Sequence, residues 1–158
     1  MAATESGAQE FLTAIGKLIT PLCWQLRSFE REGEVIALAV LGEDPAFEQM
    51  LWVYCPDRGY VRCLLAARGT VPVEREPVVV ELCARINDGL VFGCAEYSFS
   101  EQVFMLRDSF DTGKNDWDDE LTSRTARLLK LGEHYSPALQ AVLGGRSAAE
   151  AIQRLEDR

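Results

Sequence analysis

The sequence predicts an α+β domain in which a twisted antiparallel sheet of five to six strands is flanked by helices. Helical and strand patterns are segregated in the order helix, strands, helix, strands, helices, which argues against a parallel doubly wound sheet. Short turns join consecutive strand patterns, as in an antiparallel meander. With 158 residues, 47% of them hydrophobic, the chain is long enough to bury a core. We therefore expect a single domain over residues 8–155, preceded by a flexible N-terminus over residues 1–7.

The first element is predicted to be an amphipathic helix that begins at Ala8. Thr4 or Ser6 is a suitable N-cap, and Pro21 ends the helix. The apolar residues of this segment recur at helical spacing, at Phe11, Leu12, Ile15, Leu18 and Ile19.

Strand patterns follow over residues 24–29, 35–41, 47–54 and 60–65. Turn residues separate them at 32–33, 42–45 and 55–59. The run over residues 35–41 is unbroken in its apolar character, so we expect a strand that is covered on both faces. These segments would form the first part of the sheet.

The second half begins with a helix that has Pro77 in its first turn and Gly89 as a left-handed C-cap. Strands are predicted over residues 90–99 and 102–110, and a loop over 111–115. Asp116 then caps a helix that we expect to be interrupted near Gly132, with a further apolar stripe starting near Pro137. A last short helix is predicted from the capping box of Ser147 and Glu150.

Charge and cysteine content restrict the partners and the compartment. The chain has 16 basic and 25 acidic residues and a net charge of −9, which disfavours direct nucleic-acid binding. A basic protein, including one that itself binds nucleic acid, is a possible client. The cysteines have apolar neighbours and no C-x-x-C spacing, as expected for buried thiols in a reducing cytoplasm; they are Cys23, Cys55, Cys63, Cys83 and Cys94. We expect no membrane span and no signal peptide.

No catalytic or cofactor motif is recognisable, so we expect a non-enzyme without cofactor or metal. His134 is the one histidine, and no G-x-S-x-G occurs. The segment 112–114 resembles part of a phosphate loop but lacks the required glycine and hydroxyl. The acidic residues over 111–120 are explained by helix capping. An enzyme would require His134 in a cleft beside a carboxylate or a thiol.

Two segments resemble the YbjN family of bacterial proteins. The first is 85–93, where a helix ending in Ile86-Asn87 is followed by Phe92-Gly93. The second is 134–151, with an aromatic–proline pair, a glycine break and a short capped helix. The resemblance implies a fold similar to type III secretion chaperones, a homodimer, and a role as a sensory-transduction regulator linked to stress responses. It brings no catalytic residues.

In the fold that this resemblance implies, the second helix often contributes to the dimer contact. The residues expected on the dimer or partner surface are Val78, Val79, Leu82, Ile86, Leu90 and Phe92. We therefore expect a homodimeric, chaperone-like adaptor that binds a protein across the helix-free face of the sheet or along its edge. The alternative is a small-molecule-sensing regulatory domain, with a pocket beside Trp52 or Trp117.

Overall fold

The computed structural model describes residues 2–42, 46–113 and 116–157, and these form an α+β domain as predicted. Six antiparallel strands form one sheet in the order β1-β2-β3-β4-β6-β5. The strands are β1 Leu26–Arg31, β2 Glu34–Val40, β3 Phe47–Cys55, β4 Tyr60–Ala67, β5 Cys94–Ser98 and β6 Val103–Asp111. The helices are α1 Ala2–Ile19, α2 Glu76–Gly89, α3 Trp117–Leu143 and α4 Ala148–Glu156.

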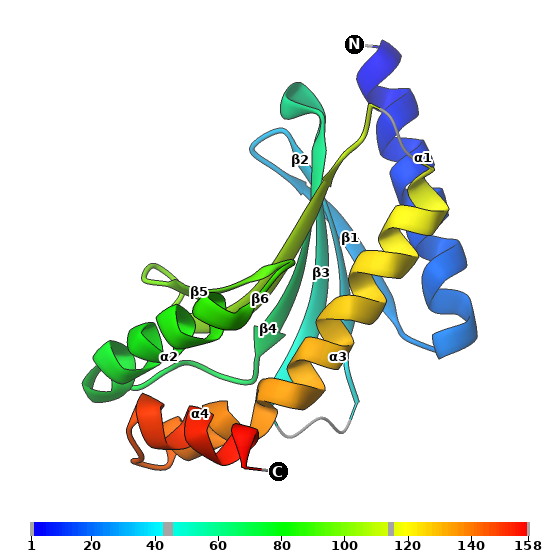
Figure 1. Ribbon diagram of the computed structural model, residues 1–158. Helices are drawn as coiled ribbons and strands as arrows, with labels where there is room; N and C mark the ends of the chain where they lie inside the picture. The colour runs from blue at the N-terminus through cyan, green and yellow to red at the C-terminus, as the bar shows by residue number, and fades with distance from the viewer. Residues whose placement is uncertain (1, 43–45, 114–115, 158) are drawn as a thin grey trace.

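The helices pack together on one side of the sheet (Figure 1). The long α3 crosses the sheet, α1 lies beside it, and α2 and α4 lie at the other end of the domain (Figure 1). All four contribute buried side chains to one apolar core that also contains the inward side of every strand except β1. The sheet therefore has an inward face covered by helices and an outward face that none of these helices reaches.

The first helix is longer than predicted. It begins at Ala2, so the suggested caps Thr4 and Ser6 lie inside it, and residues 2–7 form its first turns. Pro21 lies in a short 3₁₀ turn after the helix, η1 Thr20–Leu22, in agreement with its predicted role as a terminator. The flexibility of residues 1–7 in solution stays a prediction.

The apolar run over residues 35–41 is covered on one face only, which corrects the expectation of burial on both. Val35, Ala37 and Ala39 are buried against the helices. Ile36 and Leu38 point to the outward face and are partly exposed. The run is unbroken because the outward face is itself apolar here. Beyond Gly42, the turn predicted over 42–45 lies outside the described residues.

The third helix is continuous, although an interruption was predicted at Gly132 and a new start near Pro137. A Cβ at Gly132 would lie 2.5 Å from Leu65 Cδ2, so the glycine lets the helix approach β4 closely. Pro137 inside a helix costs about 3 kcal/mol. The neighbouring Leu139 and Val142 are buried in the core, and their burial offsets this cost.

The predicted starts of α2, α3 and α4 are confirmed. Asp116 accepts a hydrogen bond from the Asp118 amide at 2.9 Å, and Ser147 and Glu150 form a reciprocal capping box. Pro77 lies in the first turn of α2. Gly89, however, is the last residue of that helix and does not take the left-handed conformation; Gly93 does, with φ +75°. Residues 90–93 form a loop, and the predicted strand starts only at Cys94.

Candidate functional site

The strand register assigns the outward side chains to rows that cross the sheet. One row runs from Phe29 through Ile36 and Val53 to Arg62. The next row contains Arg27, Leu38, Leu51, Leu64 and Arg107. Since successive side chains alternate between faces, all of these point away from the helices.

The apolar outward side chains gather in the half of the sheet nearest β1. We call this set the apolar half-face; it consists of Phe29, Ile36, Leu38, Val40, Leu51, Val53 and Leu64. Phe29 and Val40 are each 49% exposed. Val53 and Leu64 are nevertheless buried, in a small cluster separate from the core beneath the helices. This half of the face is therefore apolar and open.

An ion pair shields part of this cluster. Arg62 on β4 and Glu34 on β2 are 2.8 Å apart, so their side chains reach across the intervening β3. Cys55 on β3 donates from Sγ to Glu34 Oε1 at 3.0 Å, and its burial, followed by this hydrogen bond, raises the pKa of the thiol. This ion pair bounds the apolar half-face at one end.

The other half of the outward face contains charged and polar side chains together with Val103 and Met105 of β6. Arg107 on β6 and Glu96 on β5 form an ion pair at 2.9 Å. Ser109 and Asp111, further along β6, are exposed. The outward face is therefore mainly apolar over the centre of β2, β3 and β4, whereas β5 and β6 add an ion pair and exposed polar residues.

Strand β1 is an open edge. All of its residues except Leu26 are exposed. A two-residue turn, Glu32 and Gly33 with φ of 53° and 81°, joins it to β2. In such a hairpin the two residues that flank the turn form a hydrogen-bonded pair. The residues of β1 that alternate with them therefore direct their N–H and C=O groups away from β2, toward the open edge. These residues are Leu26, Ser28 and Glu30, and their edge-facing N–H and C=O groups have no partner among the described residues.

Strand β5, the opposite edge, is paired at Ala95 by a side chain of α2. The Asn87 amide donates from Nδ2 to the Ala95 carbonyl at 2.9 Å, and its Oδ1 accepts from the Ala95 N–H at 2.7 Å. It thereby takes the place of a neighbouring strand at this residue. Gly93, which turns the chain into β5, would bring a Cβ to 3.0 Å from the Arg107 carbonyl. Both residues belong to the segment 85–93 singled out in the sequence, so that segment has a structural role.

The residues predicted as a dimer or partner surface divide into two groups. Val79, Leu82 and Ile86 are buried in the core, so the structure corrects their assignment to a free surface: they face β5 and the other helices. Val78 and Leu90 are partly buried against the same core. Phe92 is 61% exposed, with the Arg127 guanidinium 4.7 Å from its ring centroid.

Two further exposed apolar residues, Val80 and Val91, were not singled out in the sequence. Val91 is 83% exposed in the loop before β5, and Val80 is exposed on the outer side of α2. The position of Val80 between the buried residues of α2 indicates its outward direction, because 100° separates successive helical positions. For Val91 no sequence signal was available.

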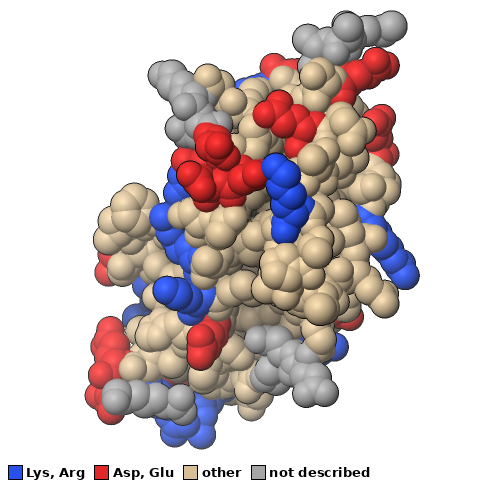
Figure 2. All heavy atoms as spheres, turned by 90° about the vertical axis from the view of Figure 1, so that its right-hand side faces the viewer, with Lys and Arg blue, Asp and Glu red and all other residues tan. Residues whose placement is uncertain are grey.

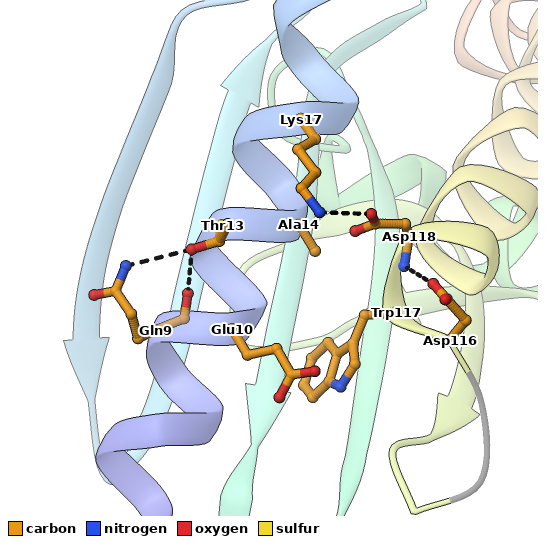
Figure 3. A pocket seen from close by; sticks show the side chains of 8 residues that line it. All are labelled: Gln9, Glu10, Thr13, Ala14, Lys17, Asp116, Trp117 and Asp118. Atoms are coloured by element: carbon orange, nitrogen blue, oxygen red, sulfur yellow. Dashed lines mark hydrogen bonds and ion pairs between the residues drawn. The ribbon is translucent and has the colours of Figure 1, made fainter.

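The expected pocket beside Trp117 has a counterpart, a cleft of about 360 Å³ between α1 and the start of α3 (Figure 3). Lys17 and Asp118 are 2.7 Å apart beside it; their hydrogen bond and the charge of Asp118 raise the Lys17 pKa. Trp117 packs edge-on against Tyr54. Acidic side chains gather on the surface around α1 and the start of α3 (Figure 2). The cleft is thus lined mainly by charged and polar groups.

Trp52 lies in the core beneath the helices. Its ring is fully buried, and Nε1 donates to Thr125 Oγ1 at 2.9 Å. The tryptophan points to the helix-covered face, and the pocket expected beside it stays a prediction. Its aromatic character is used for packing.

His134 lies in a hollow of about 180 Å³ between α2, α3 and α4. Glu156 also lines this hollow, but the one contact recorded for His134 in the described chain is edge-on packing against Tyr135. Cys55, Cys63 and Cys83 are buried as predicted, whereas Cys23 is exposed. The described residues contain no cluster of three or more histidine, cysteine or acidic side chains suited to a metal ion. None of the described helices has the length and apolar character needed to cross a bilayer.

Comparisons with known proteins give a likeness of overall arrangement. No family model matches the chain, and no curated protein matches it. The structure is similar to one chain of the HopA1–SchA chaperone–effector complex, at 16% identity and a TM-score of 0.45, covering 80% of this chain and 92% of that one. It is also similar to one chain of the ExsC–ExsE complex, at 15% identity and a TM-score of 0.44, covering 84% and 92% respectively. Membership of the YbjN family stays a prediction.

Proposed function

We propose that this protein is a non-enzymatic, chaperone-like adaptor that holds an extended segment of a partner protein along β1. The observation that carries the proposal is the continuity of an apolar half-face with an unpaired edge strand at the same end of the sheet. An added strand would gain main-chain hydrogen bonds from the edge and side-chain contacts from the face. Neither contribution requires a cofactor.

The energetic terms are individually modest and act together. Each main-chain hydrogen bond at Leu26, Ser28 or Glu30 contributes about 0.5–1.5 kcal/mol net. Burial of apolar surface on Phe29 and its neighbours adds about 25 cal/mol for each Å² removed from water. Ordering of the bound segment opposes both terms. The combination favours a reversible complex with an unfolded or extended client.

The proposal is tested by site-specific photocrosslinking in the native host. A photoreactive phenylalanine analogue in place of Phe29 is expected to give crosslinks to one partner segment, mapped by mass spectrometry. The matched control places the same analogue at Phe99, which is exposed in the hairpin between β5 and β6. Equal crosslinking from both positions, or none from position 29, contradicts the proposal.

A backbone variant separates strand addition from simple apolar contact. Ser28→Pro removes an N–H that points away from β2, so the β1–β2 ladder is retained. Ser28→Ala keeps this N–H and serves as the control. We expect capture of the crosslinked partner to fall at least about tenfold in the proline variant only.

We further propose that the protein acts as a homodimer that self-associates through the exposed apolar residues of α2 and the following loop. These are Val80, Val91 and Phe92, adjoined by Leu90. Light scattering is expected to give twice the 17.6 kDa chain mass, and Val91→Asp combined with Phe92→Ser is expected to give the single mass. A monomer at micromolar concentration in the unmodified protein contradicts this part of the proposal.

A further inference from the structure

The chemistry of β1 defines the segment that it accepts, if the proposed function holds. We infer that this segment is an antiparallel strand with an apolar residue opposite Phe29, acidic residues opposite Arg27 and Arg31, and a basic residue opposite Glu30. In order along the partner, the pattern is acidic, basic, apolar, polar, acidic. The inference rests on the proposed strand addition and names its specificity.

The side chains of β1 on the outward face of the sheet determine the apolar position and the two acidic positions of the partner pattern. Arg27, Phe29 and Arg31 occupy alternate positions, all are exposed, and neither arginine forms an ion pair among the described residues. Arg31 lies opposite Glu34, but Glu34 is bound by Arg62. The two guanidinium groups therefore stand on either side of an apolar ring without a carboxylate partner.

The geometry of strand addition brings partner side chains close to these groups. Because Leu26, Ser28 and Glu30 would make the hydrogen bonds, the residues between them would lie in non-hydrogen-bonded pairs. In such pairs the Cβ atoms are about 4.5–5.5 Å apart, which is the closer of the two antiparallel arrangements. Opposite charges at these positions attract, and like charges repel.

The basic position of the partner pattern is determined by Glu30, on the inward face of the sheet. Glu30 points toward α1 and lines a cleft of about 330 Å³ together with Glu5 and Asp57. Three carboxylates from three different segments meet there, and no basic side chain lines the cleft. A residue of the added strand opposite Glu30 would enter this acidic environment, which favours lysine or arginine.

A second copy of β1 does not satisfy the same surface. Antiparallel self-pairing centred on Phe29 places Arg27 opposite Arg31 of the other copy, twice. Self-pairing centred on Glu30 places the two carboxylates opposite each other. In both registers, like charges lie opposite each other and oppose edge-to-edge pairing of two copies, whereas a different chain with the inferred pattern places opposite charges there.

Two synthetic peptides test the inference by fluorescence anisotropy with the full chain. The matched peptide contains Thr-Glu-Lys-Leu-Thr-Glu-Thr, and the charge-swapped peptide contains Thr-Lys-Glu-Leu-Thr-Lys-Thr. The net charge of the protein is −9, so nonspecific attraction would favour the swapped peptide. We expect the opposite preference, with the matched peptide binding at least about tenfold more tightly at about 0.05 M salt and losing most of this advantage at about 0.5 M.

A charge-reversal variant supplies the decisive comparison. Arg27→Glu combined with Arg31→Glu is expected to reverse the preference in favour of the swapped peptide. Lys130→Glu combined with Arg154→Glu changes the net charge equally at exposed positions of α3 and α4, and is expected to leave the preference unchanged. An equal response of both variants overturns the inference.

The failure of the inference and that of the proposed function give different results. Equal binding of both peptides, abolished by Ser28→Pro, overturns the charge pattern and leaves strand addition standing. Binding of neither peptide overturns both. Binding that survives Ser28→Pro places the peptide elsewhere and also overturns both.

Discussion

The two edge strands of the sheet differ in how their backbone is satisfied and in what lies beside them. At β5 the Asn87 amide pairs with Ala95, α2 covers the inward side, and the outward side carries an ion pair. At β1 every second residue leaves its backbone groups free, and the outward side carries Phe29 between Arg27 and Arg31, next to the apolar side chains of β2. Edge strands are commonly protected against unwanted pairing. A domain that protects one edge and leaves the other open separates the part that maintains the fold from the part available for binding.

The largest expected contrast comes from shortening an apolar side chain at each end. Leu82→Ala empties a buried site beneath β5 and is expected to cost about 3–4 kcal/mol of unfolding free energy. Phe29→Ala, at the exposed edge, is expected to cost about 0.5 kcal/mol. Urea denaturation measures both. Comparable losses would mean that β1 also contributes substantially to the stability of the fold.

A smaller contrast comes from adding a methyl group to a glycine at each end. Gly93 and Gly33 both have positive φ, so alanine is strained at either position. At Gly93 the new Cβ also meets the Arg107 carbonyl at 3.0 Å, whereas at Gly33 no atom lies within 4 Å. Gly93→Ala is expected to cost about 2–3 kcal/mol and Gly33→Ala about 1 kcal/mol. Thermal unfolding of both variants checks the difference, and equal shifts would contradict the close approach.

Removing the closure of β5 is expected to make the two edges more alike. Asn87→Ala leaves the Ala95 N–H and C=O unpaired, at a cost of about 1–2 kcal/mol. Hydrogen exchange should show a protected Ala95 amide that becomes fast in the variant, while the Ser28 amide is fast in both. A protected Ser28 amide in the unmodified protein would show that β1 already has a partner, for example a second copy.

A further effect appears only at alkaline pH. Burial of the Cys83 thiol in α2 raises its pKa from the usual 9.0 to about 12. The folded chain therefore retains this proton over a pH range in which the unfolded chain releases it. The contribution to stability is complete below about pH 9 and is lost as the pH rises toward 12. Cys83→Ala should reduce the decline of unfolding free energy over this range; an unchanged decline would contradict the burial of the thiol.

Much of the fold was predictable because its signals are local. The turns at 32–33 and 55–59, the capping residues Asp116 and Ser147, and the position of Pro77 each act within a few residues of themselves. Such signals located every strand, although β5 begins later than expected, and the starts of α2, α3 and α4. The expectation failed where a distant contact decided the outcome, as at Gly132, where the approach of Leu65 explains a glycine that otherwise looks like a helix breaker.

The candidate site was less accessible to sequence reasoning for the same reason. The apolar run over 35–41 does not reveal which face lacks a helix, and the helical spacing of Val79, Leu82 and Ile86 is the same for a core face as for an interface. The closure of β5 depends on a side chain of α2 meeting the backbone of β5, and no spacing rule encodes that contact. A helix-free face was anticipated; the strand that borders it was not.

The Asn87 amide also limits how many molecules can join. An intermolecular sheet that grows without limit requires two unpaired edge strands in each molecule, one for each neighbouring molecule. In this molecule the edge strand β5 is already paired at Ala95 by the side chain of Asn87. At Ala95 this border cannot accept a further strand, so under the proposed function a strand added at β1 would not be followed by a second one pairing at that residue.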